Sequence, residues 1–174
     1  GNVTVAADSK ENLVTVAAGI GAAAGTAGIG AAADVHVINT DTEATISDMA
    51  EVGSYDTATG TVTNRAGAVE VTAEDTSDTK VNAASAGLSF GAGVGAGAAS
   101  ATDVINKNIL ANIGKGSQIY AKNIAVKATE NDGILTTANG VAGAVTVALE
   151  GSVSVSNVKH TITADVGNDA TINA

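Results

Sequence analysis

The stretch that decides the fold is Val69-Glu70-Val71-Thr72-Ala73, in which small or β-branched aliphatic residues occupy every second position. The same alternation occurs at Val3-Thr4-Val5-Ala6-Ala7 and at Ile124-Ala125-Val126-Lys127-Ala128. A period of two is typical of a β-strand with one buried face. Its recurrence predicts a repetitive architecture in which each unit buries its apolar face against its neighbours.

Each of these segments begins a unit with the same layout. A polar stretch comes next, then a run rich in Gly and Ala, and then one of three residues, Asn39, Asn106 or Asn157. Behind each Asn lies a strand-like ending, namely Ala44-Thr45-Ile46, Ala111-Asn112-Ile113 or Ala164-Asp165-Val166. We therefore divide residues 1–174, a single β-solenoid segment, into approximate repeat units 1–67, 68–122 and 123–174.

The composition favours thin β-layers over a compact globular core. Aromatic residues make up 2% of the chain, which contains 21 Gly and no Pro, Cys or Trp. Globular cores rely on aromatic side chains that bury about 150–250 Å² each. Because Val, Ile, Leu and Ala must form the interior here, we predict an all-β, elongated right-handed parallel β-helix (β-solenoid) built from internal repeats.

The charge balance excludes several classes of partner. With a formal net charge of −10 and only 8 Lys and Arg residues, the chain cannot assemble the basic patch that nucleic acids or anionic membranes require. The absence of Cys excludes disulfides and thiolate metal sites. The expected partners are neighbouring β-solenoid repeats or further copies of the chain end to end, with any host-cell or matrix receptor unidentified.

The apolar alternation changes phase at each repeated Asn. Before Asn157, the alternating apolar residues from Val145 to Val155 occupy odd positions. After it, those from Val158 to Val166 occupy even positions. Asn tolerates left-handed backbone conformations, and its amide can bond a neighbouring coil. The phase change predicts that the three Asn residues are structural corners stacked as an amide ladder, the alternative being ordinary turn residues. Other turns or loops are expected at 8–12, 53–60, 74–80, 114–117, 129–133 and 167–169, and an insertion at 54–63 should protrude.

The ends of the chain match two halves of one internal phrase. Residues 119–128 read as two short strands around a polar corner. The chain ends like the first half of this phrase and begins like the second half. We therefore expect an end-to-end junction, between copies or consecutive units of a longer array, formed by Asn2, Val3, Val5, Ile172, Asn173 and Ala174.

The uncharged run 12–33 has several interpretations. It is long enough for a membrane helix and contains a GxxxG pattern, but Gly and Ala contribute little insertion energy, so membrane insertion is not expected. A phosphate loop would need a Gly-Lys-Ser/Thr sequence, and a dinucleotide fingerprint would need a downstream acid after a strand and a helix. The structural interpretation is that Gly and Ala allow neighbouring backbones to approach closely.

Candidate chemical residues are few. His36 and His160 are the only imidazoles and lack a clustered His or Cys partner, so we expect both at solvent-facing strand positions. The acidic run 74–78 offers oxygen ligands for Ca²⁺ but matches neither an EF-hand nor a β-roll nonapeptide. The sequence predicts no catalytic, cofactor-binding or metal-binding residues and no enzymatic activity.

The phrase at 119–128 and the Gly/Ala runs closed by Val37-Ile38-Asn39 and Val104-Ile105-Asn106 resemble repeats of filamentous haemagglutinin-like and leukotoxin-like adhesins of Gram-negative bacteria. This resemblance implies a right-handed parallel β-helical shaft, export through the outer membrane, surface display and adhesion. It implies no catalytic residues.

The sequence thus predicts a non-enzymatic shaft or stalk segment of a bacterial cell-surface or secreted filamentous adhesin, located outside the cell. The alternative is a self-assembling extracellular matrix fibre subunit that stacks end to end. Two further alternatives are an ice-binding solenoid, which needs regular Thr rows, and a polysaccharide-acting enzyme, which needs carboxylates clustered on one face.

Overall fold

The computed structural model describes all 174 residues and contains strands but no helix. Each repeat unit supplies two long strands and one short strand. The first unit forms β1 (Val3–Ala23), β2 (Ala27–Ile46) and β3 (Glu51–Val52). The second and third units form β6 (Val69–Ser89), β7 (Val94–Ile113), β8 (Gln118–Tyr120), β9 (Ile124–Ala144), β10 (Val147–Val166) and β11 (Thr171–Asn173).

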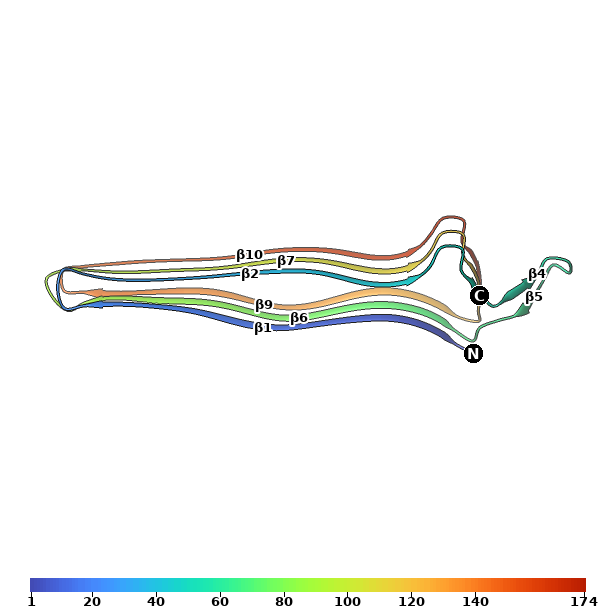
Figure 1. Cartoon of the computed structure of the whole chain (residues 1–174), viewed down its shortest axis with the longest axis horizontal. Coiled ribbons are helices and arrows are strands. Elements are labelled where there is room, and N and C mark those ends of the chain that lie inside the picture. The colour runs from blue at the N-terminus through green and yellow to red at the C-terminus, as the bar shows by residue number, and fades with distance from the viewer.

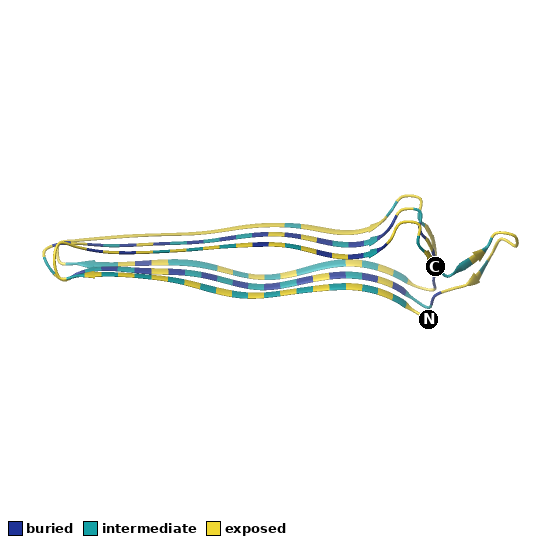
Figure 2. Cartoon of the chain, in the orientation of Figure 1, coloured by how far each residue is buried: buried dark blue, intermediate teal, exposed yellow.

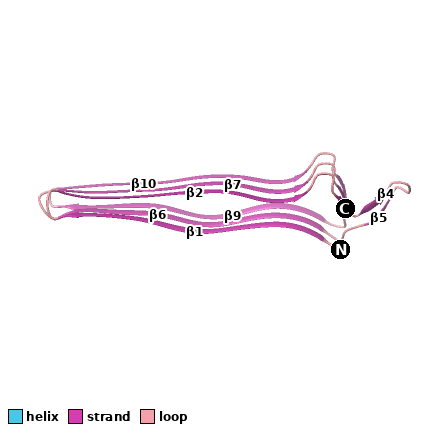
Figure 3. Ribbon diagram, viewed as in Figure 1, coloured by secondary structure: helices cyan, strands magenta, loops and turns pink.

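Equivalent strands of the three units pair side by side in three parallel sheets (Figures 1 and 3). Their strand orders are β1-β6-β9, β10-β7-β2 and β11-β8-β3. The long pairs keep one register throughout, so that Val3 pairs with Val69 and Val69 with Ile124. Ala44, Ala111 and Ala164 align in the same way in the second sheet. The structure confirms an all-β chain whose parallel sheets are stacked from repeated strands.

The long axis of the molecule follows the strands and not the stack. Strands β1, β6 and β9 run beside β2, β7 and β10 over nearly the whole length of the molecule, and both termini lie at one end (Figure 1). A strand of 20 residues at about 3.3 Å per residue spans about 65 Å, whereas three strands at about 4.8 Å spacing add only about 10 Å. Elongation along the stack therefore requires more units than these three.

The predicted insertion is confirmed as a protruding antiparallel hairpin (Figure 1). It consists of β4 (Ser54–Asp56) and β5 (Thr61–Asn64), and its turn is closed by Asp56, whose Oδ1 accepts a hydrogen bond from the Ala58 amide at 2.8 Å. Tyr55 from this hairpin stacks on Tyr120, with ring centroids 5.8 Å apart. This stacking fixes the base of the hairpin against the short sheet.

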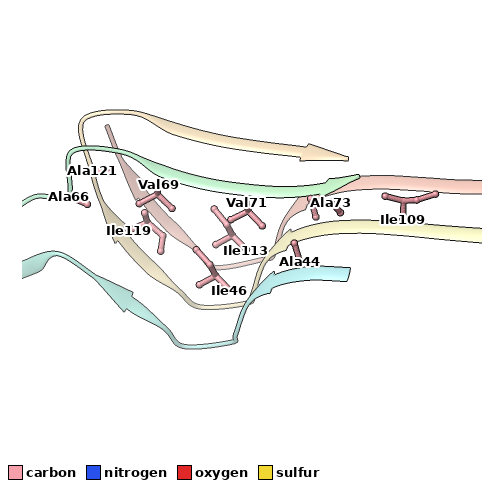
Figure 4. Packing of buried hydrophobic residues seen from close by; sticks show 11 residues of the cluster. Ala44, Ile46, Ala66, Val69, Val71, Ala73, Ile109, Ile113, Ile119 and Ala121 are labelled. Atoms are coloured by element: carbon pink, nitrogen blue, oxygen red, sulfur yellow. The ribbon is translucent and has the colours of Figure 1, made fainter. Parts of the chain in front are cut away.

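Buried aliphatic residues form two separate cores. The larger core lies near the termini and includes Val69, Val71, Ile109 and Ile113, all at most 1% exposed (Figure 4). A smaller core further along the strands contains Val81, Ala83, Ala99 and Ala101. Burial is concentrated in the middle unit, because only its strands have neighbours on both sides (Figure 2).

Gly residues bring the two long sheets together towards the end far from the termini. A Cβ on Gly87 would lie 1.7 Å from the carbonyl oxygen of Ala96, and one on Gly19 would lie 1.8 Å from that of Ala31. The interpretation of the Gly/Ala runs as sites of close backbone approach is confirmed. No helix of the chain has the length and apolarity needed to cross a membrane.

The prediction of structural corners at Asn39, Asn106 and Asn157 is wrong. All three lie inside long strands, β2, β7 and β10, with their side chains exposed. The backbone keeps its alternation there. The apolar residues change face at Asn39 and Asn157, whereas Ile105 and Ile109 on either side of Asn106 are both buried. Val35 and Val37 point outward and are 69% and 55% exposed. The inward positions beside them are occupied by His36 and Ile38.

The three Asn residues also do not form one ladder. The amide Nδ2 of Asn106 donates a hydrogen bond to Oδ1 of Asn39 at 2.9 Å on the outer face. Asn157 pairs with Val104 in the backbone register, two positions away from Asn106. A side-chain bond between stacked Asn residues therefore links the first two units only.

Candidate functional site

The expected turns at 8–12, 74–80 and 129–133 are instead the middle portions of β1, β6 and β9, whereas those at 114–117 and 167–169 lie between strands. Because the strands continue, every second residue in these segments points between the two long sheets, and the polar residues at these positions do so too. Together with inward-facing polar residues of β2, β7 and β10, they form a group that we call the charged layer. It consists of Glu11, His36, Asp75, Asp103, Lys107, Glu130, Asp132 and His160.

Lys107 of β7 lies at the centre of the charged layer and connects all three units. Its ammonium group contacts a carboxylate oxygen of Asp75, and lies 3.0 Å from Asp132 Oδ1 and 3.1 Å from Glu11 Oε2. Its side chain is fully buried. Burial is the largest single effect and lowers its pKa, but the hydrogen bonds to Asp75, Asp132 and Glu11 together raise the pKa above its ordinary value. Lys107 therefore remains a cation inside the protein.

Hydroxyl groups complete the shell around two of these carboxylates. Thr42 Oγ1 donates to Asp75 Oδ2 at 3.1 Å, and Ser9 Oγ donates to Glu11 Oε1 at 2.7 Å. Burial raises the pKa of Glu11, but the hydrogen bonds from Ser9, Lys107 and Thr40 outweigh this effect and lower it overall. Glu11 is thus stabilised in the ionised form.

The prediction that His36 and His160 face solvent is wrong. The His36 side chain is 11% exposed, and its Nδ1 lies 3.1 Å from Oδ1 of the fully buried Asp103. The His160 side chain is 23% exposed and also points between the sheets. His36 bridges β2 and β7 within one sheet, whereas His160 of β10 meets residues of β9 in the opposite sheet.

His160, Glu130 and Asp132 form the most compact part of the charged layer. Nδ1 of His160 lies 2.5 Å from Glu130 Oε2, and Nε2 lies 3.0 Å from Asp132 Oδ2. Potential ligand atoms of the three residues all lie within 4.8 Å of one another. Both carboxyl side chains are 7% exposed. An imidazole and two carboxylates brought together in this way constitute a candidate metal centre.

The two carboxyl groups differ in their proton affinity. Burial, followed by the neighbouring Asp132 carboxylate, raises the pKa of Glu130 to about 7. Burial also raises the pKa of Asp132, but the neighbouring Glu130 carboxyl group and the hydrogen bonds from Ser77 and Lys107 outweigh it and lower the value overall. Asp132 is therefore the ionised partner, and Glu130 can hold a proton near neutral pH.

The predicted junction residues lie in different units and are not brought together within one chain. Val3 and Val5 belong to β1 and pair with Val69 and Val71. Ile172 and Asn173 belong to β11 and pair with Ile119 and Tyr120. Asn2 Oδ1 accepts a hydrogen bond from the Ala68 amide at 3.1 Å, and Asn173 Oδ1 accepts one from Arg65 at 2.6 Å, while Ala174 follows at the chain end.

Comparison with known proteins found no matching family model, no matching curated protein and no matching solved structure.

The sequence does not predict the charged layer, because its acidic runs are typical of turns. The signal that identifies it is parity: Asp75 shares its odd numbering with Val71, Ala73 and Val81 in an uninterrupted alternation. Extending that strand through its polar middle places Asp75 inside. The same extension places Glu130 and Asp132 on the inward face set by Ile124 and Val126.

Proposed function

We propose that the chain is a non-enzymatic shaft segment, of the right-handed β-solenoid type, whose units stack on further units of the same kind. The support comes from how its edges are built. The three units already pair strand by strand in one register, and neither edge of the stack is closed by a different structural element. A rod of stacked units has a length set by the number of units, which suits a spacer and not a catalyst.

The observation that carries the proposal is a difference in burial between equivalent positions. Ile109 of β7 and Ile162 of β10 pair in register on the inward face, yet Ile109 is fully buried and Ile162 is 49% exposed. Ile113 and Val166 show the same contrast, at 0% and 43%. The two strands differ in that β10 lacks a neighbour on its outer side, whereas β7 lies between β10 and β2. Another unit at this edge would bury these side chains as the middle unit buries its own.

The backbone at the edges favours the same kind of partner. An edge strand exposes N–H and C=O groups that recruit another strand unless they are blocked. The edge strands β9 and β10 are 21 and 20 residues long and contain no Pro. Long, uninterrupted edges of this kind can accept a parallel strand over their full length.

The resemblance of the repeats to large adhesins supports a place on the bacterial surface or in a secreted filament. In that setting the chain would act as a stalk that holds a binding region away from the cell. The second candidate, a matrix fibre built from copies of this chain, is favoured by the open edges on both sides of the stack. Both functions depend on end-to-end stacking of units.

Sedimentation velocity over a range of protein concentrations tests this proposal. We expect the average size to grow with concentration, and electron micrographs to show rods that lengthen across the strand direction. Replacing Ile162 by Lys places a charge on the inward face of the open edge and should keep the chain monomeric. Thr163→Lys, on the outward face of the same strand, is the matched control and should assemble like the wild type. A wild-type chain that stays monomeric at every concentration would contradict the proposal.

A further inference from the structure

The triad Glu130, Asp132 and His160 contains buried polar atoms that the protein itself leaves without hydrogen bonds. Oε1 of Glu130, Oδ2 of Asp132 and Nε2 of His160 all lack a hydrogen-bond partner. The two carboxyl side chains are more than nine-tenths buried. Native proteins leave few such groups unsatisfied, because each costs about 1–3 kcal/mol. Three of them within one cluster indicate a missing ligand.

Asp132 is held so that one of its oxygens remains available. Its Oδ1 accepts hydrogen bonds from Lys107 at 3.0 Å and from Ser77 at 2.5 Å. Its Oδ2 faces Nε2 of His160 at 3.0 Å, but the two atoms are not aligned as a hydrogen bond. Anchoring one oxygen while presenting the other is how outer residues orient a metal-binding carboxylate.

The imidazole of His160 cannot satisfy both carboxylates as a neutral group. Each ring nitrogen lies close to a different carboxylate oxygen, at 2.5 Å and 3.0 Å. A neutral imidazole carries one N–H, so only one of these contacts can be a hydrogen bond donated by His160. A cation among the three side chains would be attracted by both carboxylates and by a ring nitrogen lone pair.

The charge of the surroundings also favours a cation. Within the charged layer, Lys107 is the only permanently cationic side chain, and it is shared by Glu11, Asp75 and Asp132. Glu130 receives no contact from it. Buried carboxylates need a compensating charge, and the layer contains more carboxylates than Lys107 alone can neutralise.

From this geometry we infer that Glu130, Asp132 and His160 bind one divalent transition-metal ion, with Zn²⁺ as the best-suited ion, and that the ion joins the two long sheets. Zn²⁺ accepts imidazole nitrogen at about 2.0–2.1 Å and carboxylate oxygen at about 2.0–2.2 Å, so tetrahedral ligands lie about 3.4 Å apart. The observed separations of 2.5 and 3.0 Å require the side chains to open by less than about 1 Å. Ca²⁺ is disfavoured because it takes six to eight oxygen ligands.

The metal site would reinforce a shaft unit, but it is not required for the stacking of units. Glu130 and Asp132 lie on β9 and His160 on β10, which belong to opposite sheets of the third unit. A bound ion would therefore cross-link the sheets where the interior is polar and has no aliphatic core. Failure to bind metal would leave the stacking proposal unchanged, and failure to stack would leave the metal site unchanged.

The test is isothermal titration of the chain, without a polyhistidine tag, with Zn²⁺ and separately with Ca²⁺. We expect one Zn²⁺ per chain, a higher melting temperature on binding, and at least about tenfold weaker binding in His160→Gln. His36→Gln is the matched control, because His36 lies in the same charged layer beside a single carboxylate, and it should bind Zn²⁺ like the wild type. Glu130→Gln should weaken binding as His160→Gln does.

A second measurement separates metal binding from folding. The variants should keep the β-type circular dichroism spectrum of the wild type in the presence of a chelator. Co²⁺ bound to the wild type should give visible absorption bands that His160→Gln loses and His36→Gln retains. The inference is overturned if the folded wild type binds no Zn²⁺, if Ca²⁺ binds as tightly as Zn²⁺, or if His36→Gln weakens binding as much as His160→Gln.

Discussion

The ammonium group of Lys107 and the carboxylate of Asp75 form an ion pair in which neither side chain is exposed to solvent. The pair lies between the two long sheets, between the larger and the smaller aliphatic core. Two buried charges are stable there only because each also meets further polar groups. This arrangement makes the polar interior of the protein sensitive to the loss of a single charge.

Removing the cation should therefore destabilise the fold strongly. Lys107→Met leaves Asp75, Asp132 and Glu11 without their shared partner, and breaking a buried pair typically costs about 3–5 kcal/mol. Urea titration monitored by circular dichroism measures the change in the free energy of unfolding. Lys115→Met is the control, because the side chain of Lys115 is 67% exposed and its removal should have little effect. Equal effects of the two substitutions would show that the charged layer does not stabilise the fold.

The close approach of the sheets predicts a sharp difference between two Gly residues. Gly87→Ala would place a methyl group against the backbone of Ala96 and should destabilise by about 1–3 kcal/mol or more. Gly151→Ala meets nothing within 4 Å and should be neutral or slightly stabilising. Thermal melting of both variants measures the difference. If Gly87→Ala melts at the wild-type temperature, the backbones of Gly87 and Ala96 do not approach closely.

The exposed amide pair on the outer face should contribute little. Asn106→Ala removes the hydrogen bond to Asn39, but water can replace it because both amides are exposed. We expect a change within about 0.5 kcal/mol in the free energy of unfolding, compared with about 1–3 kcal/mol for a buried partner left unsatisfied. A loss in the larger range, measured by denaturant titration, would mean that the amides are shielded by a neighbouring surface.

The raised pKa of Glu130 predicts a pH dependence of stability in the presence of a chelator. Glu130 faces Asp132 on its own strand, His160 on β10, and the Lys107 and Asp75 charges of the neighbouring unit. Because its pKa rises from 4.5 to about 7 on folding, its stabilising contribution is complete below about pH 4.5 and is lost as the pH rises through 7. We expect the free energy of unfolding to fall by up to about 3 kcal/mol over this interval.

Glu130→Gln should flatten this dependence, since the amide does not titrate. The lowered pKa values of Glu11 and Asp132 act in the opposite sense and at lower pH, where stability is lost as the pH falls through their folded values. A wild-type stability that rises between about pH 5 and 7 would contradict the assignment of Glu130 as the proton-holding group.

The sequence was sufficient to predict strands and their repetition, because period-two alternation and in-phase repeats are local signals. It was insufficient where polar residues occupy inward positions. Asp75 and Asp132 resemble turn residues when read alone, and their burial depends on Lys107 reaching them from another sheet. The phase change at Asn157 was likewise ambiguous, since a corner and a change of apolar face produce the same pattern in sequence.

The stacking of units can be tested directly by disulfide formation, because the chain contains no Cys. Thr4, Glu70 and Ala125 align in register on the outer face of β1, β6 and β9, so Thr4 and Ala125 of one chain lie two strand spacings apart. That separation, about 9.6 Å, exceeds the limit of about 7 Å for a disulfide. When one copy stacks on the next, however, Ala125 of the first lies beside Thr4 of the second at a single strand spacing.

The decisive measurement is therefore a non-reducing gel of the double variant Thr4→Cys, Ala125→Cys after mild oxidation. Stacking predicts a ladder of covalent multimers that collapses to monomer on reduction. The control pair Thr4→Cys, Asn131→Cys uses the same two strands out of register and should form few multimers. An in-register variant that stays monomeric after oxidation, or a control that forms the same ladder, would contradict end-to-end stacking of the units.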